Sequence, residues 1–280
     1  MSVFAGKGKY VLVGLKIFKL KPLLTMAAST VAYTYFYGFP YAVGFVGLIF
    51  VHECGHLIAM RHYGIPFSPM VFIPFMGASI GMEAPARDAY EEGIVALGGP
   101  VLGSLGAFAT HIGAEMTGSQ LLFALAEAGY MINLFNLLPI GSMDGGRVAN
   151  AISPVVGGLG LVGGTALAYQ GVIMNPIFYL ILLGGYYSFA SRVMGWQEAE
   201  PKGSHYYNIG ASKTAILTAL YASIVAALML AMYENAKKKK TTAQLRYEKD
   251  RQITEGNTEP WTEDDPRYPV YDFGTDDEEW

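Results

Sequence analysis

Two histidines and a glutamate form a group capable of metal chemistry in the first quarter of the chain. His52, Glu53 and His56 match the pattern H-E-x-x-H. On a helix, residues i and i+4 share a face, so both imidazoles can bind one Zn²⁺ while Glu53 stands beside them to take a proton from water. The pattern lies in an apolar stretch, where each ionisable group costs about 2.5–3.5 kcal/mol to insert into a membrane. We therefore favour a zinc site with a general base over two histidines near a helix end.

A third metal ligand must come from elsewhere in the chain, because a catalytic zinc usually has three protein ligands and one open position. Asp144 directly follows a predicted apolar helix, and the topology below places it at a depth similar to that of the histidines. It is the preferred candidate, and the alternative is a turn aspartate in Asp-Gly-Gly. The carboxylates in or beside apolar stretches are Glu83, Glu91, Glu92, Glu115, Glu127 and Asp144.

The composition predicts that these residues are positioned by membrane helices. Of the 280 residues 52% are hydrophobic and 15% are charged, against roughly a quarter charged in soluble domains. This excludes a disordered chain, and the net charge of −4 gives no indication of nucleic-acid binding. Since a spanning helix needs roughly 20 mainly apolar residues, we expect six or seven spans. The apolar runs are Leu23–Tyr37, Tyr41–Met60, Gly93–Gly113, Leu121–Leu138, Val155–Ile173, Pro176–Ala190 and Ser212–Tyr233.

The placement of charge predicts an orientation. The first fifty residues hold lysines but no Asp or Glu, so the N-terminus should be cytosolic and the second helix should return to the cytosol at Arg61. The active site would then lie toward the cytosolic side of a multi-pass membrane protein. Seven spans, however, would put Lys237–Lys240 on the outer side, against the rule, and the number of spans between residues 155 and 190 stays open.

We divide the chain into three parts. Residues 1–22 are a basic cytosolic or interfacial N-terminus, and residues 23–233 are a membrane-embedded domain with a catalytic core at about 41–150. Residues 234–280 are a basic and then acidic tail, predicted to be disordered. Its last forty residues contain four Lys or Arg against twelve Asp or Glu.

The two motifs together resemble the site-2 proteases, a family of intramembrane zinc metalloproteases. In that family an H-E-x-x-H helix pairs with a distant N-x-x-P-x-P-x-L-D-G element, whose Asp is the third zinc ligand. The resemblance covers about residues 41–150. Of the second element, Asn136, Pro139, Asp144 and Gly145 match, while Gly141 and Met143 replace the second Pro and the Leu.

The resemblance implies an all-α polytopic membrane protein with a short re-entrant β-hairpin near the active site. It implies regulated intramembrane proteolysis, in which the transmembrane segments of substrate proteins are cleaved within the bilayer. One Zn²⁺ per chain would be held by His52, His56 and Asp144, with Glu53 as the general base. The expected partners are a transmembrane substrate and the lipid bilayer, without nucleic acid or a nucleotide cofactor.

Residues 66–84 fit the hairpin that the family uses to pair with an extended substrate strand. Their prolines oppose helix, and residues 71–73 and 79–80 flank a predicted turn at Met76-Gly77-Ala78. Gly77, Ala78 and Asn136 are therefore the predicted substrate-binding residues. An ordinary apolar loop, and for Asn136 an interhelical hydrogen bond, are the alternatives.

Two other functions are compatible with the same residues. One is a catalytically idle relative that binds and retains membrane clients, and the other is a metal carrier. The general base Glu53 distinguishes them from a protease, because neither rival needs it.

Overall fold

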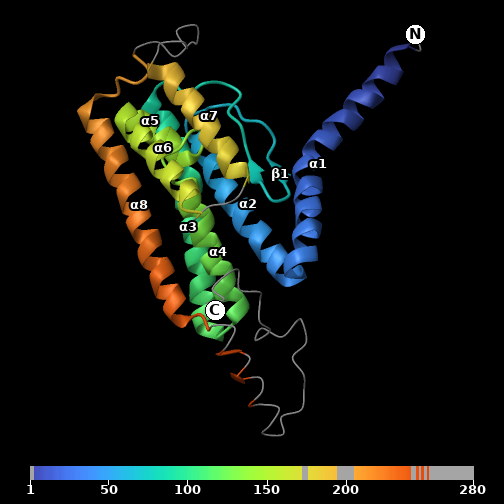
Figure 1. The fold of residues 1–280 in the computed structure, drawn as a ribbon. Helices are drawn as coiled ribbons and strands as arrows, with labels where there is room; N and C mark the ends of the chain where they lie inside the picture. Colours follow the sequence, from blue (N-terminus) through green and yellow to red (C-terminus); the bar gives the residue numbers. More distant parts are fainter. Residues whose placement is uncertain are drawn as a thin grey trace.

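The part of the chain that the structure describes is mostly helical and carries one small sheet (Figure 1). The computed structural model describes residues 3–171, 176–193 and 205–240 with residues 244, 245, 247, 248 and 251, and for 3–19 and 191–193 it describes the backbone alone. The elements are α1 Val3–Tyr37, α2 Phe39–His62, β1 Val71–Ile73, β2 Gly77–Ser79, α3 Ala89–Thr117, α4 Gln120–Asn136, α5 Asp144–Ile152, α6 Pro154–Tyr169, α7 Pro176–Val193 and α8 Gly210–Lys238.

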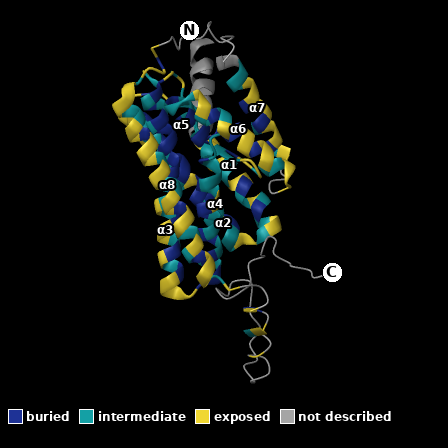
Figure 2. Cartoon of the chain, turned by 60° about the vertical axis from the view of Figure 1, so that its left-hand side comes forward, coloured by how far each residue is buried: buried dark blue, intermediate teal, exposed yellow. Residues whose placement is uncertain are grey.

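Among the described residues, the helices α2, α3 and α8 are long and apolar enough to cross a membrane. Six or seven spans are not confirmed beyond these three, since α4 and α6 have only 17 and 16 residues. The buried residues face the interior of the bundle, while large apolar side chains such as Phe108 and Leu230 are exposed on outward faces (Figure 2). An exterior of this kind is expected where lipid replaces water, and it supports membrane association.

Two helices extend across residue limits used in the predicted three-part division. Helix α1 runs without a break through Pro22, across the predicted boundary at residue 22, and α8 continues past Tyr233 to Lys238. Most of the predicted disordered tail lies outside the described residues. The three-part division itself stays a prediction.

Two glycines bring α2 and α3 into backbone contact at the centre of the bundle. A Cβ on Gly55 would lie 2.0 Å from the carbonyl oxygen of Gly98, and a Cβ on Gly98 would lie 2.6 Å from that of Gly55. Any side chain here would force the helices apart, because real Cβ atoms do not approach so closely. The contact places the histidine-bearing part of α2 directly against α3.

Helices α6 and α7 form an antiparallel pair whose core includes Leu161 and Phe178 (Figure 1). The end of α8 lies beside the α3–α4 turn, about 40 Å along α3 from its start. There Lys238 pairs with Glu115, and Lys239 Nζ lies 2.5 Å from a Glu127 carboxylate oxygen. These ion pairs give two lysines of the run acidic partners at the end of α8.

The predicted hairpin after α2 is present, but its turn was placed wrongly. Strands β1 and β2 are antiparallel, with Phe72 opposite Ala78 and Ile73 opposite Gly77. The turn is formed by residues 74–76, and Phe75 adopts a φ of 63°. Gly77 and Ala78 thus belong to β2 and not to the turn, although the backbone of Gly77, like that of Phe75, has a positive φ.

Helix α1 covers one edge of this hairpin. The Phe72 N–H donates to Thr25 Oγ1 (3.2 Å), and the Phe75 N–H donates to Tyr33 Oη (3.1 Å). Because Phe72 directs its N–H away from β2, Phe72 and Ala78 form a non-hydrogen-bonded pair, and the backbone groups of Ala78 point away from β1. The outer edge of β2 is therefore the open edge.

Candidate metal centre

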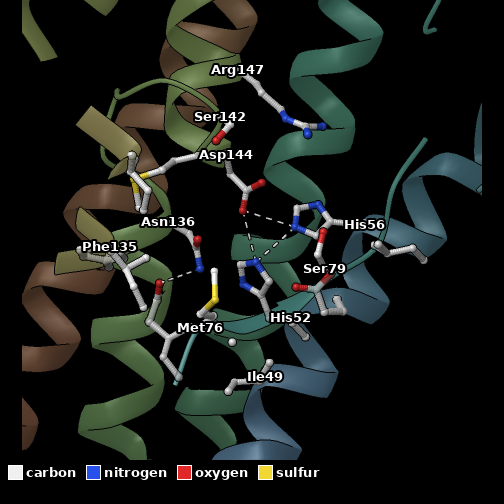
Figure 3. Close-up of a pocket in the computed structure, with 18 of the residues that line it drawn as sticks. Ile49, His52, His56, Met76, Ser79, Phe135, Asn136, Ser142, Asp144 and Arg147 are labelled. Atoms are coloured by element: carbon white, nitrogen blue, oxygen red, sulfur yellow. Dashed lines mark hydrogen bonds and ion pairs between the residues drawn. The ribbon is translucent and has the colours of Figure 1, made fainter. Parts of the chain in front are cut away.

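The two motif histidines and Asp144 meet at one point inside the bundle (Figure 3). His52 and His56 face inward from α2, with 3% and 9% of their surfaces exposed. The Asp144 Oδ2 atom lies 3.2 Å from His52 Nε2 and 3.3 Å from His56 Nε2, and the two Nε2 atoms are 3.2 Å apart. Of the carboxylates considered from the sequence, Asp144 alone joins the histidines among the described residues.

This triangle of ligand atoms fits zinc. In a tetrahedral site with bonds of about 2.0–2.1 Å, neighbouring ligand atoms lie roughly 3.3–3.4 Å apart, close to the separations found here. Two imidazoles and a carboxylate are also a ligand set that catalytic zinc uses. Burial raises the pKa of Asp144, but the nearby His56 and His52 outweigh it and hold this pKa below its ordinary value. The carboxylate is therefore ionised at neutral pH, as a metal ligand must be.

Each histidine is oriented through its other ring nitrogen. His52 Nδ1 lies 2.9 Å from Asn133 Oδ1, and His56 Nδ1 lies 2.9 Å from the Val95 carbonyl oxygen. Both partners accept, so each Nδ1 carries a proton, and Nε2 is the ring nitrogen left to bind a metal. Asn133 is itself fixed, because its amide nitrogen donates to the Gly129 carbonyl (2.7 Å).

No metal-orienting role was assigned to Asn133 from the sequence, and in the structure its amide makes an interhelical hydrogen bond. The bond does join α4 to α2, but its partner is a predicted zinc ligand. A fully polar amide on an apolar helix was the available signal, and the structure shows that Asn133 is only 2% exposed.

Replacing Asn133 with Ala should weaken zinc binding about 10- to 100-fold, because His52 loses the acceptor that sets its tautomer and ring orientation. A competition titration with a zinc-binding dye measures this. Asn136→Ala is the matched control, since the Asn136 amide nitrogen donates to the Ile132 carbonyl (3.1 Å) and leaves the histidines untouched. Equal affinities in the two variants would contradict the role given to Asn133.

Glycines also make room for the centre. A Cβ on Gly99 of α3 would lie 2.2 Å from His56 Nε2 and 2.7 Å from His52 Nε2, so only glycine leaves space for both imidazoles. On the opposite side, a Cβ on Gly145 would lie 2.0 Å from the Leu137 carbonyl oxygen. Gly145 therefore lets the start of α5 pack against the chain that follows α4. This close packing carries Asp144, the first residue of α5, to the histidines.

The centre opens into a cavity of about 520 Å³. Glu53 lines this cavity and is only 6% exposed. Its carboxylate interacts with the backbone of Ile80, just beyond β2. A carboxylate beside three potential metal ligands, in a mostly apolar cavity, has the placement required of a general base.

The predicted substrate-binding residues line the same cavity. Gly77 and Ala78 line it from β2. Asn136, labelled in Figure 3, lines it from the end of α4. The cavity thus holds a potential metal site on one side and an open strand edge on another. The contact of these three residues with a substrate stays a prediction.

The other candidate carboxylates are used elsewhere. Glu91 pairs with Arg87 at 2.5 Å, and Glu83 is exposed. Glu127, which lies within the apolar helix α4, forms the ion pair with Lys239 described above. These pairs explain why charge is tolerated in apolar helices without a metal.

A zinc metalloprotease of Methanocaldococcus jannaschii is similar to part of the chain. The two are 28% identical over 113 residues, which make up 39% of this chain and 32% of that protein. The match thus spans about a third of the relative's length, and it supports a relationship to zinc metalloproteases. No protein-family model matches the chain, and no solved structure is significantly similar to it.

Proposed function

We propose that the protein is an intramembrane zinc endopeptidase of the site-2 type, which cleaves transmembrane segments of other proteins. The observation that carries this proposal is the meeting of His52, His56 and Asp144 at separations suited to zinc, with Glu53 in the same cavity. The similarity to a zinc metalloprotease supports it. We further propose one zinc per chain and a multi-pass arrangement with the centre toward the cytosolic side.

The chain's own residues supply the remaining chemistry. A bound zinc lowers the pKa of water and polarises a peptide carbonyl. Glu53 takes the proton of the attacking water and delivers it to the leaving amine, which is the work of a general base that then acts as an acid. The apolar walls of the cavity restrict the entry of bulk water. Interactions between charges in the centre are therefore only weakly screened.

The open edge of β2 offers a way to hold the substrate. A helical segment shields its peptide bonds, so it must be extended before cleavage. The Ala78 N–H and C=O point away from β1, and Ala78 lines the cavity. An extended peptide can add to such an edge through main-chain hydrogen bonds. We propose that this pairing carries the scissile bond to the metal.

Replacing Ala78 with Pro should reduce cleavage at least tenfold and leave zinc content unchanged, because proline removes the edge N–H without touching the ligands. Ala78→Val is the control, since it keeps the N–H and suits a strand. Initial cleavage rates and zinc per chain are measured for both. Full cleavage by the proline variant would argue against strand addition at this edge.

The proposed function is tested by removing and restoring the metal. The protein is reconstituted in liposomes with a panel of single-span peptides, and new peptide ends are identified by mass spectrometry. We expect cleavage within apolar segments, loss of cleavage after chelation, and recovery with about one equivalent of zinc. Protein that binds zinc but cleaves none of the peptides would favour the idle relative or the metal carrier.

A further inference from the structure

Arg147 is a cation in the wall of the catalytic cavity that the proposed reaction leaves unused. It lies on α5, three residues after Asp144, and its side chain is partly buried. It lines the cavity beside Ser142 and Asp144. Figure 3 shows its guanidinium on the side of the cavity where Asp144 and His56 lie, away from the apolar Ile49 and Phe135.

Other basic side chains near the start of α3 are already engaged. Arg87 pairs with Glu91 at 2.5 Å, and Lys213 pairs with Asp88 at 2.7 Å. The Arg147 guanidinium, by contrast, forms no hydrogen bond or ion pair with any residue in the part of the chain that the structure describes. A charge held in a cavity without a partner marks a position where a ligand can supply one.

The chemistry of the side chain indicates which ligand. A guanidinium has five N–H donors and no acceptor, and its planar fork matches the two oxygens of a carboxylate. A peptide in the cavity offers a carboxylate either as an Asp or Glu side chain or as its C-terminus. The negative Asp144 is the proposed metal ligand, so a bound zinc would offset its charge and leave that of Arg147 for the peptide.

We infer that Arg147 binds a carboxylate of the peptide held in the cavity and thereby selects among substrates. The inference rests on the proposed function. Arg147 is thus a specificity-determining residue, because it binds a group of the substrate other than the scissile bond. The apolar wall formed by residues such as Ile49 and Phe135 would take the rest of the segment, so the preferred substrate is an apolar strand with one acidic group at its polar end.

The inference is tested by the affinities of three peptide hydroxamates with one apolar sequence, titrated calorimetrically into the zinc-loaded protein. One ends in a free carboxylate, one in a carboxamide, and one in a carboxamide with an added Asp. We expect a carboxylate-bearing probe to bind about tenfold more tightly than the plain carboxamide, as for a hydrogen-bonded charge pair. The probe that shows the preference identifies the source of the carboxylate.

Arg147→Met should abolish the preference and leave the affinity of the plain carboxamide unchanged. If Arg147 had only a structural role, its replacement would lower the affinity of all three probes to the same extent. Arg147→Gln is a second neutral variant, and zinc content shows whether each variant keeps its centre. Arg61→Met is the matched control, because Arg61 lies 5.6 Å from the centre of the Phe67 ring and does not line the cavity.

Two results would overturn the inference while leaving the proposed function intact. One is equal affinity of all three probes for the unmodified protein, and the other is a preference that survives in both neutral variants. If zinc is present and none of the hydroxamates binds, the proposed function fails together with the inference.

Discussion

Replacing Glu53 with Gln is expected to lower the rate of peptide cleavage by about 10²- to 10⁴-fold, the usual contribution of a general base. Zinc content should stay at the level of the unmodified protein. Glu53 lines the cavity but is not one of the three side chains that meet at the metal position. Gln has almost the same shape as Glu, so the packing of α2 is kept and only the ability to accept a proton is lost.

The measurement pairs single-turnover cleavage of a reconstituted peptide with zinc analysis of the same samples. Glu53→Asp serves as the matched control, since it keeps the carboxylate but withdraws it by one methylene, and we expect it to retain part of the activity. An idle relative or a metal carrier would keep its client or metal binding in both variants. Unchanged cleavage by Glu53→Gln would mean that another group takes the proton.

Replacing either His56 or Asp144 with Ala should reduce bound zinc from about one per chain to near zero. Each change leaves two of the three ligands, and two protein ligands do not make an ordinary catalytic zinc site. Asp144→Ala also removes the negative charge that faces both imidazoles across 3.2 and 3.3 Å. Zinc is measured by mass spectrometry of the purified protein in detergent and requires no knowledge of the substrate.

His62→Ala is the control for this experiment. His62 is exposed at the end of α2, outside the group that meets at the metal position, and its loss should leave zinc unchanged. Zinc retained by Asp144→Ala alone would show that the third ligand is misassigned while the helix pair is right. An unmodified protein that takes up no zinc after reloading would refute the protease proposal.

The sequence predicted those features that depend on local spacing. The i, i+4 geometry of a helix places His52 and His56 on one face wherever that helix lies. The hairpin at residues 66–84 was signalled by prolines that oppose helix. Asp144 was reached less directly, because it is 88 residues from His56 and only its position after an apolar helix, with a family motif, pointed to it.

The features that were missed depend on contacts between distant parts of the chain. Helix α5 was not predicted, because Asp-Gly-Gly is typical of a turn and the glycines are needed only for packing against the end of α4. Asn133 and Val95 orient the histidines through bonds that no local pattern encodes. The positive φ of Phe75 is stabilised by the bond from its N–H to Tyr33 of α1, a contact between distant parts of the chain that no local pattern encodes.

The packing of α1 over β1 also limits association between copies of the protein through the edge of this sheet. A two-stranded hairpin that nothing covers has two unpaired edges. A strand of another molecule can pair with either edge and extend the sheet between molecules. Here Thr25 and Tyr33 occupy the N–H groups of Phe72 and Phe75. A strand that pairs with β2 therefore ends the sheet at three strands. The hairpin can therefore pair with one added strand at a time, at β2. The covered edge of β1 is not available for aggregation.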